Sequence, residues 1–134
     1  DLKKLSKIKM LYWSYFEKWD ENYHLKIAKK YCGLKYTKVK EKNAINNHSH
    51  TDQKMFALHM YLAYLKFGFS RASSDTSIEI RHKRISRTQA IKIVKKYDHV
   101  FPVNYLRDYC KYFNINKKQF FKILDFHKNK FLFN

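Results

Sequence analysis

The stretch MFALHMYLAYLKFGF, residues 55–69, decides the fold prediction. Hydrophobic side chains lie on nearly every side of the helix it would form, which predicts a helix at the buried centre of a domain. Asp52 predicts the start of that helix as an N-cap. Gly68 predicts its end, because glycine enters the left-handed conformation without the steric cost of other residues. The stretch is too short, and with His59 and Lys66 too polar, to span a membrane.

Start and stop signals elsewhere in the chain predict further helices. Asp20 as N-cap and Gly33 as the stop predict a helix over residues 21–32, and a short helix is predicted from Thr76 to about Lys83. The capping box Ser86/Gln89 predicts a helix to about Tyr97, and the capping box Asn116/Gln119 predicts the last helix. Pro102 predicts the start of a helix over residues 103–113. Residues 35–51 are polar and without clear periodicity, which predicts a long loop. One proline and two glycines argue against turn-rich all-β folds. The sequence therefore predicts an all-α fold, a compact bundle of five to six helices in a single domain over 1–134.

The formal net charge is +18, which usually indicates nucleic acid or an anionic substrate. The basic residues form no dense run, however. Lys, Asn, Ile, Tyr and Phe are all abundant, as expected from AT-rich codons. One alternative is a small basic helical nucleic-acid-binding domain whose recognition helix lies within RISRTQAIKIVKKY, residues 84–97, although nucleic acid is not the expected partner. Another alternative is a subunit-docking module.

Arginine is scarce but clustered. Four of the five arginines lie between residues 71 and 87, against 24 lysines in the whole chain. In a lysine-rich background such clustering indicates a need for the planar, bidentate guanidinium group. Lys66 and Arg71 flank the predicted turn at Gly68, and the N-terminus of the next helix would direct backbone N–H groups at an anion such as phosphate. The competing interpretation is a glycine C-cap followed by a polar turn.

The candidate residues for binding an anionic substrate are His59, Lys66, Gly68, Arg71 and Arg81, with Asp75 and Arg87 as secondary candidates. Asp75 and Arg81 could instead form a surface ion pair. No catalytic residue is assigned, because the sequence has no Walker-type loop, GxGxxG, GxSxG or HExxH motif and no visible nucleophile–base arrangement. No metal site is expected, since the histidines of residues 48–50 lack further ligands nearby, Asp52 excepted.

Cellular location is predicted from the cysteines and from the start of the sequence. Cys32 and Cys110 form no CxxC pair, so free thiols in a reducing cytoplasm are expected. No signal peptide is visible. The prediction is a cytoplasmic protein.

Residues 59–102 resemble the C-terminal region of the N-acetyl sugar amidotransferase family, PP-loop ATP-dependent enzymes of bacterial surface-polysaccharide biosynthesis. The resemblance lies in His59, Tyr61 to Gly68, Arg71 with Ala72, Ile80 with Arg81, Ile85 to Asp98, and Phe101 with Pro102. Residues 105–131 also resemble the closing helices of that family, and residues 15–35 match more weakly. Ser70 replaces the family's usual glycine and Thr76 its usual small residue, which predicts a bulkier turn.

The resemblance implies an activity for a longer enzyme. Such an enzyme uses ATP, with magnesium, to adenylate the carbonyl oxygen of an N-acetylated sugar. Ammonia from a glutaminase subunit then attacks, giving an acetamidino sugar for lipopolysaccharide (O-antigen) or nonulosonic (pseudaminic-type) acid. The expected substrate is nucleotide-linked, and its phosphates would suit the cations near Gly68. The SGGxDS-type PP-loop motif is absent, so this chain is expected to be a C-terminal portion without that nucleotide-binding domain, binding no cofactor itself and inactive alone.

Overall fold

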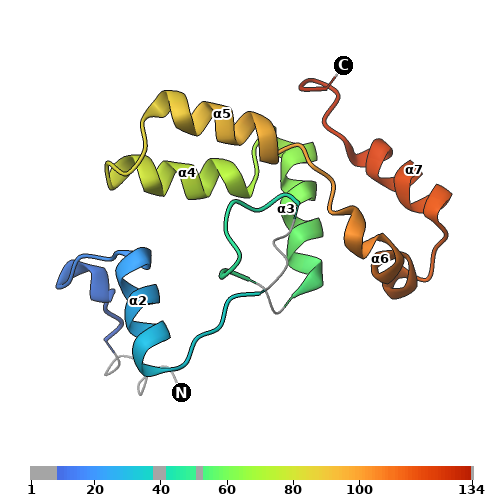
Figure 1. Ribbon diagram of the computed structural model, residues 1–134. Helices are drawn as coiled ribbons and strands as arrows, with labels where there is room; N and C mark the ends of the chain where they lie inside the picture. The colour runs from blue at the N-terminus through green and yellow to red at the C-terminus, as the bar shows by residue number, and fades with distance from the viewer. Residues whose placement is uncertain (1–8, 38–41, 51–52, 134) are drawn as a thin grey trace. The chain divides into compact units, whose positions relative to one another are not determined.

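A computed structural model of the chain describes residues 9–37, 42–50 and 53–133. The regular elements of these residues are helical throughout, which confirms the predicted all-α class. They are η1 (Trp13–Tyr15), α2 (Glu21–Tyr31), α3 (Lys54–Phe67), α4 (Arg71–Arg81), α5 (Arg87–Tyr97), η2 (Val103–Tyr105), α6 (Leu106–Phe113) and α7 (Lys117–His127) (Figure 1). Residues 42–50, in the predicted loop, form no helix or strand. No helix in the described part of the chain is long and apolar enough to cross a membrane.

The first of two compact units spans residues 1–35 and contains α2. The Asp20 carboxylate accepts hydrogen bonds from the backbone N–H groups of Asn22 (3.0 Å) and Tyr23 (3.4 Å), so the predicted N-cap is confirmed. Gly33, just past the end of α2, has φ +67°, the left-handed conformation predicted for it. No residue of α2 is buried within the described structure.

The second unit spans residues 36–134 and is built on α3, which packs against α7. Its core consists of Leu58 and Leu65 from α3, Tyr109 from α6, and Phe120 and Leu124 from α7. The Tyr109 hydroxyl donates to the backbone oxygen of Lys54 (3.0 Å), so the polar end of this buried ring is satisfied. These contacts fix α3, α6 and α7 against one another.

The helix predicted at the buried centre of the domain does supply core residues of this unit, but one side of α3 is exposed. His59, Leu62, Lys66 and Phe67 are all exposed. The reason is the number of neighbours that α3 has. Its core side chains meet α6 and α7, and Leu62 and Phe67 contribute to the hydrophobic surface that folded proteins normally retain. The predicted N-cap, Asp52, lies outside the described residues.

Helices α4 and α5 form an antiparallel pair, which Figure 1 shows running side by side. The capping box of α5 is confirmed: Ser86 Oγ accepts from the Gln89 N–H (3.2 Å), and the Ser86 N–H donates to Gln89 Oε1 (2.8 Å). The predicted start of α4 at Thr76 was wrong. The helix begins at Arg71, and the Thr76 hydroxyl donates back to the Ala72 oxygen (2.6 Å) inside the helix.

The C-terminal part of the chain returns to the end of α3. The capping box of α7 is confirmed by reciprocal hydrogen bonds of 2.9 Å between Asn116 and Gln119. Beyond α7, the Asn129 N–H donates to the Leu65 oxygen (2.9 Å) and its side-chain amide donates to the Lys66 oxygen (3.0 Å). Carbonyls at the end of a helix lack intrahelical partners, so the segment after α7 serves as a cap for α3.

Candidate functional site

The junction between α3 and α4 contains three of the candidate residues, Lys66, Gly68 and Arg71. Gly68 ends α3 with φ +79°, and its N–H donates to the Tyr64 oxygen (2.8 Å), which confirms the predicted glycine C-cap. A Cβ atom at this position would lie 3.3 Å from Leu132 Cδ1. Two residues further on, Ser70 is buried, and its hydroxyl donates to the Met60 oxygen of α3 (2.8 Å). The hydroxyl at a position where the resembled family has glycine thus ties α4 to α3.

The N-terminus of α4 is occupied by a carboxylate of the chain itself. Asp98, which follows α5 and is 3% exposed, accepts hydrogen bonds from the Ser70 N–H (2.9 Å), the Ser73 N–H (3.2 Å) and the Ser73 hydroxyl (2.5 Å). The positive end of a helix dipole attracts anions, and Asp98 takes that place here. Asp98 ends one of the segments that resemble the amidotransferase family, but it was not among the predicted site residues. A carboxylate at the C-terminal end of a helix is disfavoured by the helix dipole. The position of Asp98 at the end of its own helix was therefore the sequence signal that this carboxylate serves another part of the fold.

Arg71, the first residue of α4, is a buried cation held by protein groups. One guanidinium nitrogen donates to Asn46 Oδ1 (3.0 Å) and to the Ser49 backbone oxygen (2.9 Å). Its Nε lies 3.5 Å from Asp75 Oδ2, and the guanidinium lies 5.5 Å from the centre of the Phe56 ring. Arg71 therefore fastens the loop before α3 to the first turns of α4. This arrangement is typical of a structural clamp, in which one terminal nitrogen makes two hydrogen bonds to protein oxygens and Nε faces a carboxylate.

The remaining candidates do not converge with Arg71. His59 and Lys66 are seven residues apart, so they share an exposed face of α3 about 10 Å apart. Arg81 is exposed, and ten residues of helix place it about 15 Å from Arg71. Arg87 begins α5, and because α4 and α5 are antiparallel, Arg81 and Arg87 lie at the same end of the pair. The structure thus brings Asp75 to Arg71 and groups Arg81 with Arg87 elsewhere.

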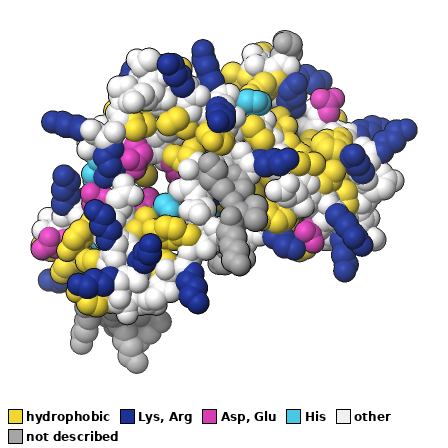
Figure 2. Space-filling view, in the orientation of Figure 1, with side chains coloured by type: hydrophobic (Ala, Val, Ile, Leu, Met, Phe, Trp, Pro, Cys, Tyr) yellow, Lys and Arg dark blue, Asp and Glu magenta, His cyan; other side chains and the backbone are white. Residues whose placement is uncertain are grey.

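The charge on the surface is dispersed. Figure 2 shows lysine and arginine side chains scattered over the visible face, with hydrophobic side chains between them. Arg84 is neutralised locally, because its Nε and a terminal nitrogen donate to the two Glu79 oxygens at 2.6 and 2.9 Å. In the part of the chain that the structure describes, no group of three or more His, Cys, Asp and Glu residues could hold a metal ion. The visible face thus offers separate cations to an anionic ligand.

A pocket that the sequence analysis missed lies between α3, α7 and the segment after α7. Its volume is about 400 Å³, and its lining includes Tyr61, Tyr64, Phe121, Asp125, Lys128 and Phe133. The phenol of Tyr61 is partly buried there, and this burial, with a smaller contribution from Tyr64, raises the pKa of Tyr61 above its ordinary value of 10.0. The lining residues come from segments more than 50 positions apart, so local sequence patterns could not reveal the pocket.

Comparison with known proteins yields one family. A family model described as "LPS biosynthesis protein WbpG-like, C-terminal domain" matches residues 16–134. The match contains all six α-helices of the described structure, the candidate residues and the pocket. A search among curated proteins gave no significant match.

Proposed function

Because the chain belongs to the WbpG-like C-terminal domain family of lipopolysaccharide biosynthesis proteins, we propose that it is the C-terminal part of an ATP-dependent amidotransferase acting on a nucleotide-linked sugar. The observation that carries the proposal is the match over residues 16–134, which places the chain in lipopolysaccharide biosynthesis. The finer reaction is supported by the resemblance of residues 59–102 to N-acetyl sugar amidotransferases. The pathway would supply O-antigen or nonulosonic acid of the pseudaminic type.

The proposed reaction replaces the carbonyl oxygen of the N-acetyl group by NH. That oxygen attacks the α-phosphorus of ATP, an O–P bond forms, and pyrophosphate leaves. Ammonia then adds to the activated carbon, and AMP leaves with the former carbonyl oxygen, so the product is an acetamidino group. Magnesium-bound ATP would be held by an N-terminal PP-loop domain, and a glutaminase subunit would release the ammonia from glutamine.

The contribution of this chain would be to hold the substrate. The phosphates of the substrate require cations that the fold leaves accessible, and Arg81 with Arg87, exposed at one end of the α4–α5 pair, is one such pair. Lys66 and His59 offer a second exposed pair on α3. Arg71 is the weakest of the candidates for direct contact, because Asn46 and Ser49 already accept from its guanidinium.

The test is the reaction of the whole protein to which this chain belongs. It would be incubated with ATP, Mg²⁺, ammonium and a panel of nucleotide-linked N-acetyl sugars, and the products analysed by mass spectrometry. We expect a sugar product in which one O is replaced by NH, formed together with AMP and pyrophosphate. This chain alone is the control and should consume no ATP. Unchanged sugars and no ATP-dependent product across the panel would overturn the proposal.

A further inference from the structure

The pocket between α3 and α7 combines aromatic ring faces with a few polar groups. The centres of the Tyr64 and Phe133 rings lie 5.1 Å apart, with an angle of 59° between the ring planes. The centre of the Tyr61 ring lies 6.3 Å from that of Tyr64. Phe121 lines the side formed by α7. With a volume of about 400 Å³ the pocket falls within the usual range for small-molecule sites, about 300 to 1,000 Å³.

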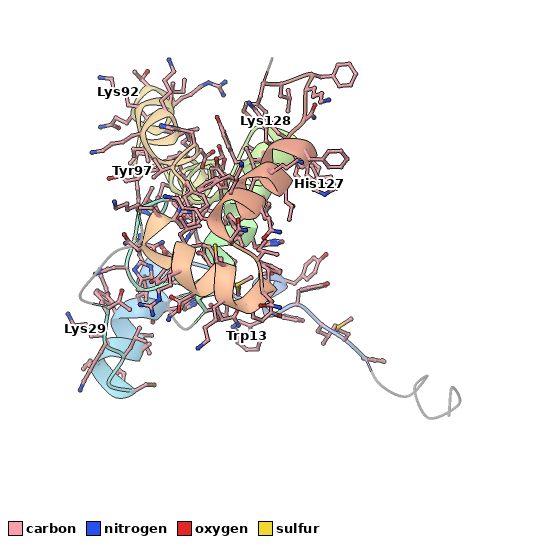
Figure 3. All side chains as sticks on the ribbon, turned by 90° about the vertical axis from the view of Figure 1, so that its right-hand side faces the viewer. Trp13, Lys29, Lys92, Tyr97, His127 and Lys128 are labelled. Atoms are coloured by element: carbon pink, nitrogen blue, oxygen red, sulfur yellow. The ribbon has the colours of Figure 1, made fainter. Side chains whose placement is uncertain are left out.

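The wall opposite α3 is held in place by hydrogen bonds. Figure 3 shows Lys128 at the end of α7, where the chain turns back toward the end of α3. The next residue, Asn129, donates to the Leu65 and Lys66 oxygens of α3. The Lys128 ammonium lies 5.4 Å from the centre of the Phe133 ring. The segment that carries Lys128 and Phe133 is thus fixed to the same helix as Tyr61 and Tyr64, which preorganises the pocket.

The polar groups of the pocket are complementary to a neutral, hydroxylated ring. The Asp125 carboxylate only accepts hydrogen bonds, the Lys128 ammonium only donates, and the Tyr61 and Tyr64 hydroxyls do both. A pyranose has the matching features, because its C–H faces are apolar while its hydroxyl and acetamido groups project from the rim. A phosphate fits poorly, since Asp125 would repel it and Lys128 is the single cation among the lining residues.

We propose that this pocket binds the N-acetylated pyranose ring of the sugar substrate. The aromatic rings cover the C–H faces of the sugar, Asp125 accepts from a hydroxyl or from the acetamido N–H, and Lys128 donates to an oxygen of the rim. The choice of an N-acetylated sugar rests on the proposed function, whereas the choice of a neutral ring rests on the pocket itself. None of the substrate-binding candidates predicted from the sequence lines this pocket.

The experiment is ligand-observed NMR on the chain with N-acetylglucosamine as the probe and uridine as the competing ring. We expect saturation transfer to the ring and acetyl protons of the sugar and a dissociation constant on the order of 1 mM, the range for so small a ligand. Transfer to uridine but not to the sugar, or to neither, would overturn the inference.

Two pairs of variants localise the binding. Phe121→Ala and Lys128→Gln change the lining of the pocket, whereas Phe126→Ala and Lys130→Gln change exposed residues of the same segment that do not line it. The first two should weaken binding about tenfold, the usual effect of losing about 1.4 kcal/mol, and the controls should leave it unchanged. Circular dichroism verifies the helices in each variant. Phe126→Ala is the control for Phe121→Ala, and Lys130→Gln is the control for Lys128→Gln. A control that weakens binding as much as its lining variant would contradict the assignment. Asp125→Asn provides a lining variant of conserved shape if Phe121→Ala fails to fold.

The two proposals fail separately. If the sugar binds and the variants behave as expected while the whole protein forms no acetamidino product, the pocket stands and the reaction is wrong. If the product forms but Phe121→Ala and Lys128→Gln leave the KM for the sugar substrate unchanged, the reaction stands and the pocket assignment is wrong.

Discussion

The carboxylate of Asp98 accepts a hydrogen bond from the backbone N–H of Ser70, 28 positions earlier in the chain, at 2.9 Å. The same carboxylate accepts from the N–H and hydroxyl of Ser73, so the residue after α5 caps the N-terminus of α4. This cap explains why α4 begins at Arg71, although the hydroxyl of the N-cap residue, Ser70, donates to Met60 and makes no capping hydrogen bond of its own. It also fixes the two antiparallel helices at the end where they adjoin α3.

Replacing Asp98 by Ala should therefore lower the free energy of unfolding. The change removes three hydrogen bonds to a buried carboxylate and leaves the N–H groups of Ser70 and Ser73 without an acceptor, a loss of about 2 kcal/mol. Urea unfolding followed by circular dichroism measures it. The control is Asp108→Ala, which breaks an exposed pair with Lys54 (3.1 Å) and should cost less than about 1 kcal/mol. Equal losses in both variants would contradict the assigned cap.

Gly68→Ala should destabilise the protein by about 1 kcal/mol, because a Cβ is unfavourable in the left-handed conformation that Gly68 adopts. A second, smaller contribution comes from Leu132, whose Cδ1 would lie 3.3 Å from the new atom. The double variant Gly68→Ala/Leu132→Ala separates the two. The cost of Gly68→Ala should be smaller in the Leu132→Ala background, and an unchanged cost would show that the segment after α7 does not press on this turn.

The parts of the fold that the sequence predicted correctly depend on short-range chemistry. Asp20, Gly33, Gly68, Ser86 with Gln89, and Asn116 with Gln119 each act within a few residues, and all were found in the predicted roles. The start of α4 depends instead on Asp98, which is distant in sequence, so the prediction from local sequence of a helix starting at Thr76 was wrong. Local patterns are reliable where the group that satisfies a helix end is itself local.

The candidate site shows the same limit. Clustering in sequence suggested that Arg71 and Arg81 act together, but they are the first and last residues of α4 and lie about 15 Å apart. Conversely, Tyr61 and Phe133 line one pocket although 72 positions separate them. Which of the arginines contact a substrate stays a prediction, because composition shows only that guanidinium groups are enriched in this segment.

The raised pKa of Tyr61 predicts a pH dependence of stability. Burial is the larger cause and Tyr64 the smaller, so the folded protein keeps the Tyr61 proton at a pH where the unfolded chain, with a pKa near 10.0, loses it. The protonated Tyr61 therefore contributes its full stabilisation at a pH below the unfolded pKa, near 10.0. This stabilisation is lost as the pH rises through the higher pKa of the folded protein. Urea unfolding over pH about 9 to 11 should show a smaller decline in Tyr61→Phe than in the unchanged protein. Tyr112→Phe, at a 72% exposed position, should leave the decline as it is.

The last prediction separates a structural arginine from a substrate-binding one. Arg71→Ala removes the hydrogen bonds to Asn46 and Ser49 and the ion pair with Asp75, so the free energy of unfolding should fall by about 2 kcal/mol. Arg81 is exposed, so Arg81→Ala should change stability by less than about 0.5 kcal/mol.

In the whole protein, Arg81→Ala should raise the KM for the nucleotide-linked sugar about tenfold, since a lost contact to phosphate is worth about 1.4 kcal/mol or more. Arg81→Lys tests whether two parallel N–H donors of a guanidinium group are needed, because lysine keeps the positive charge without that bidentate geometry. An Arg71→Ala protein with unchanged urea unfolding and a raised KM would instead place Arg71 at the substrate, and a normal KM in Arg81→Ala would remove Arg81 from it.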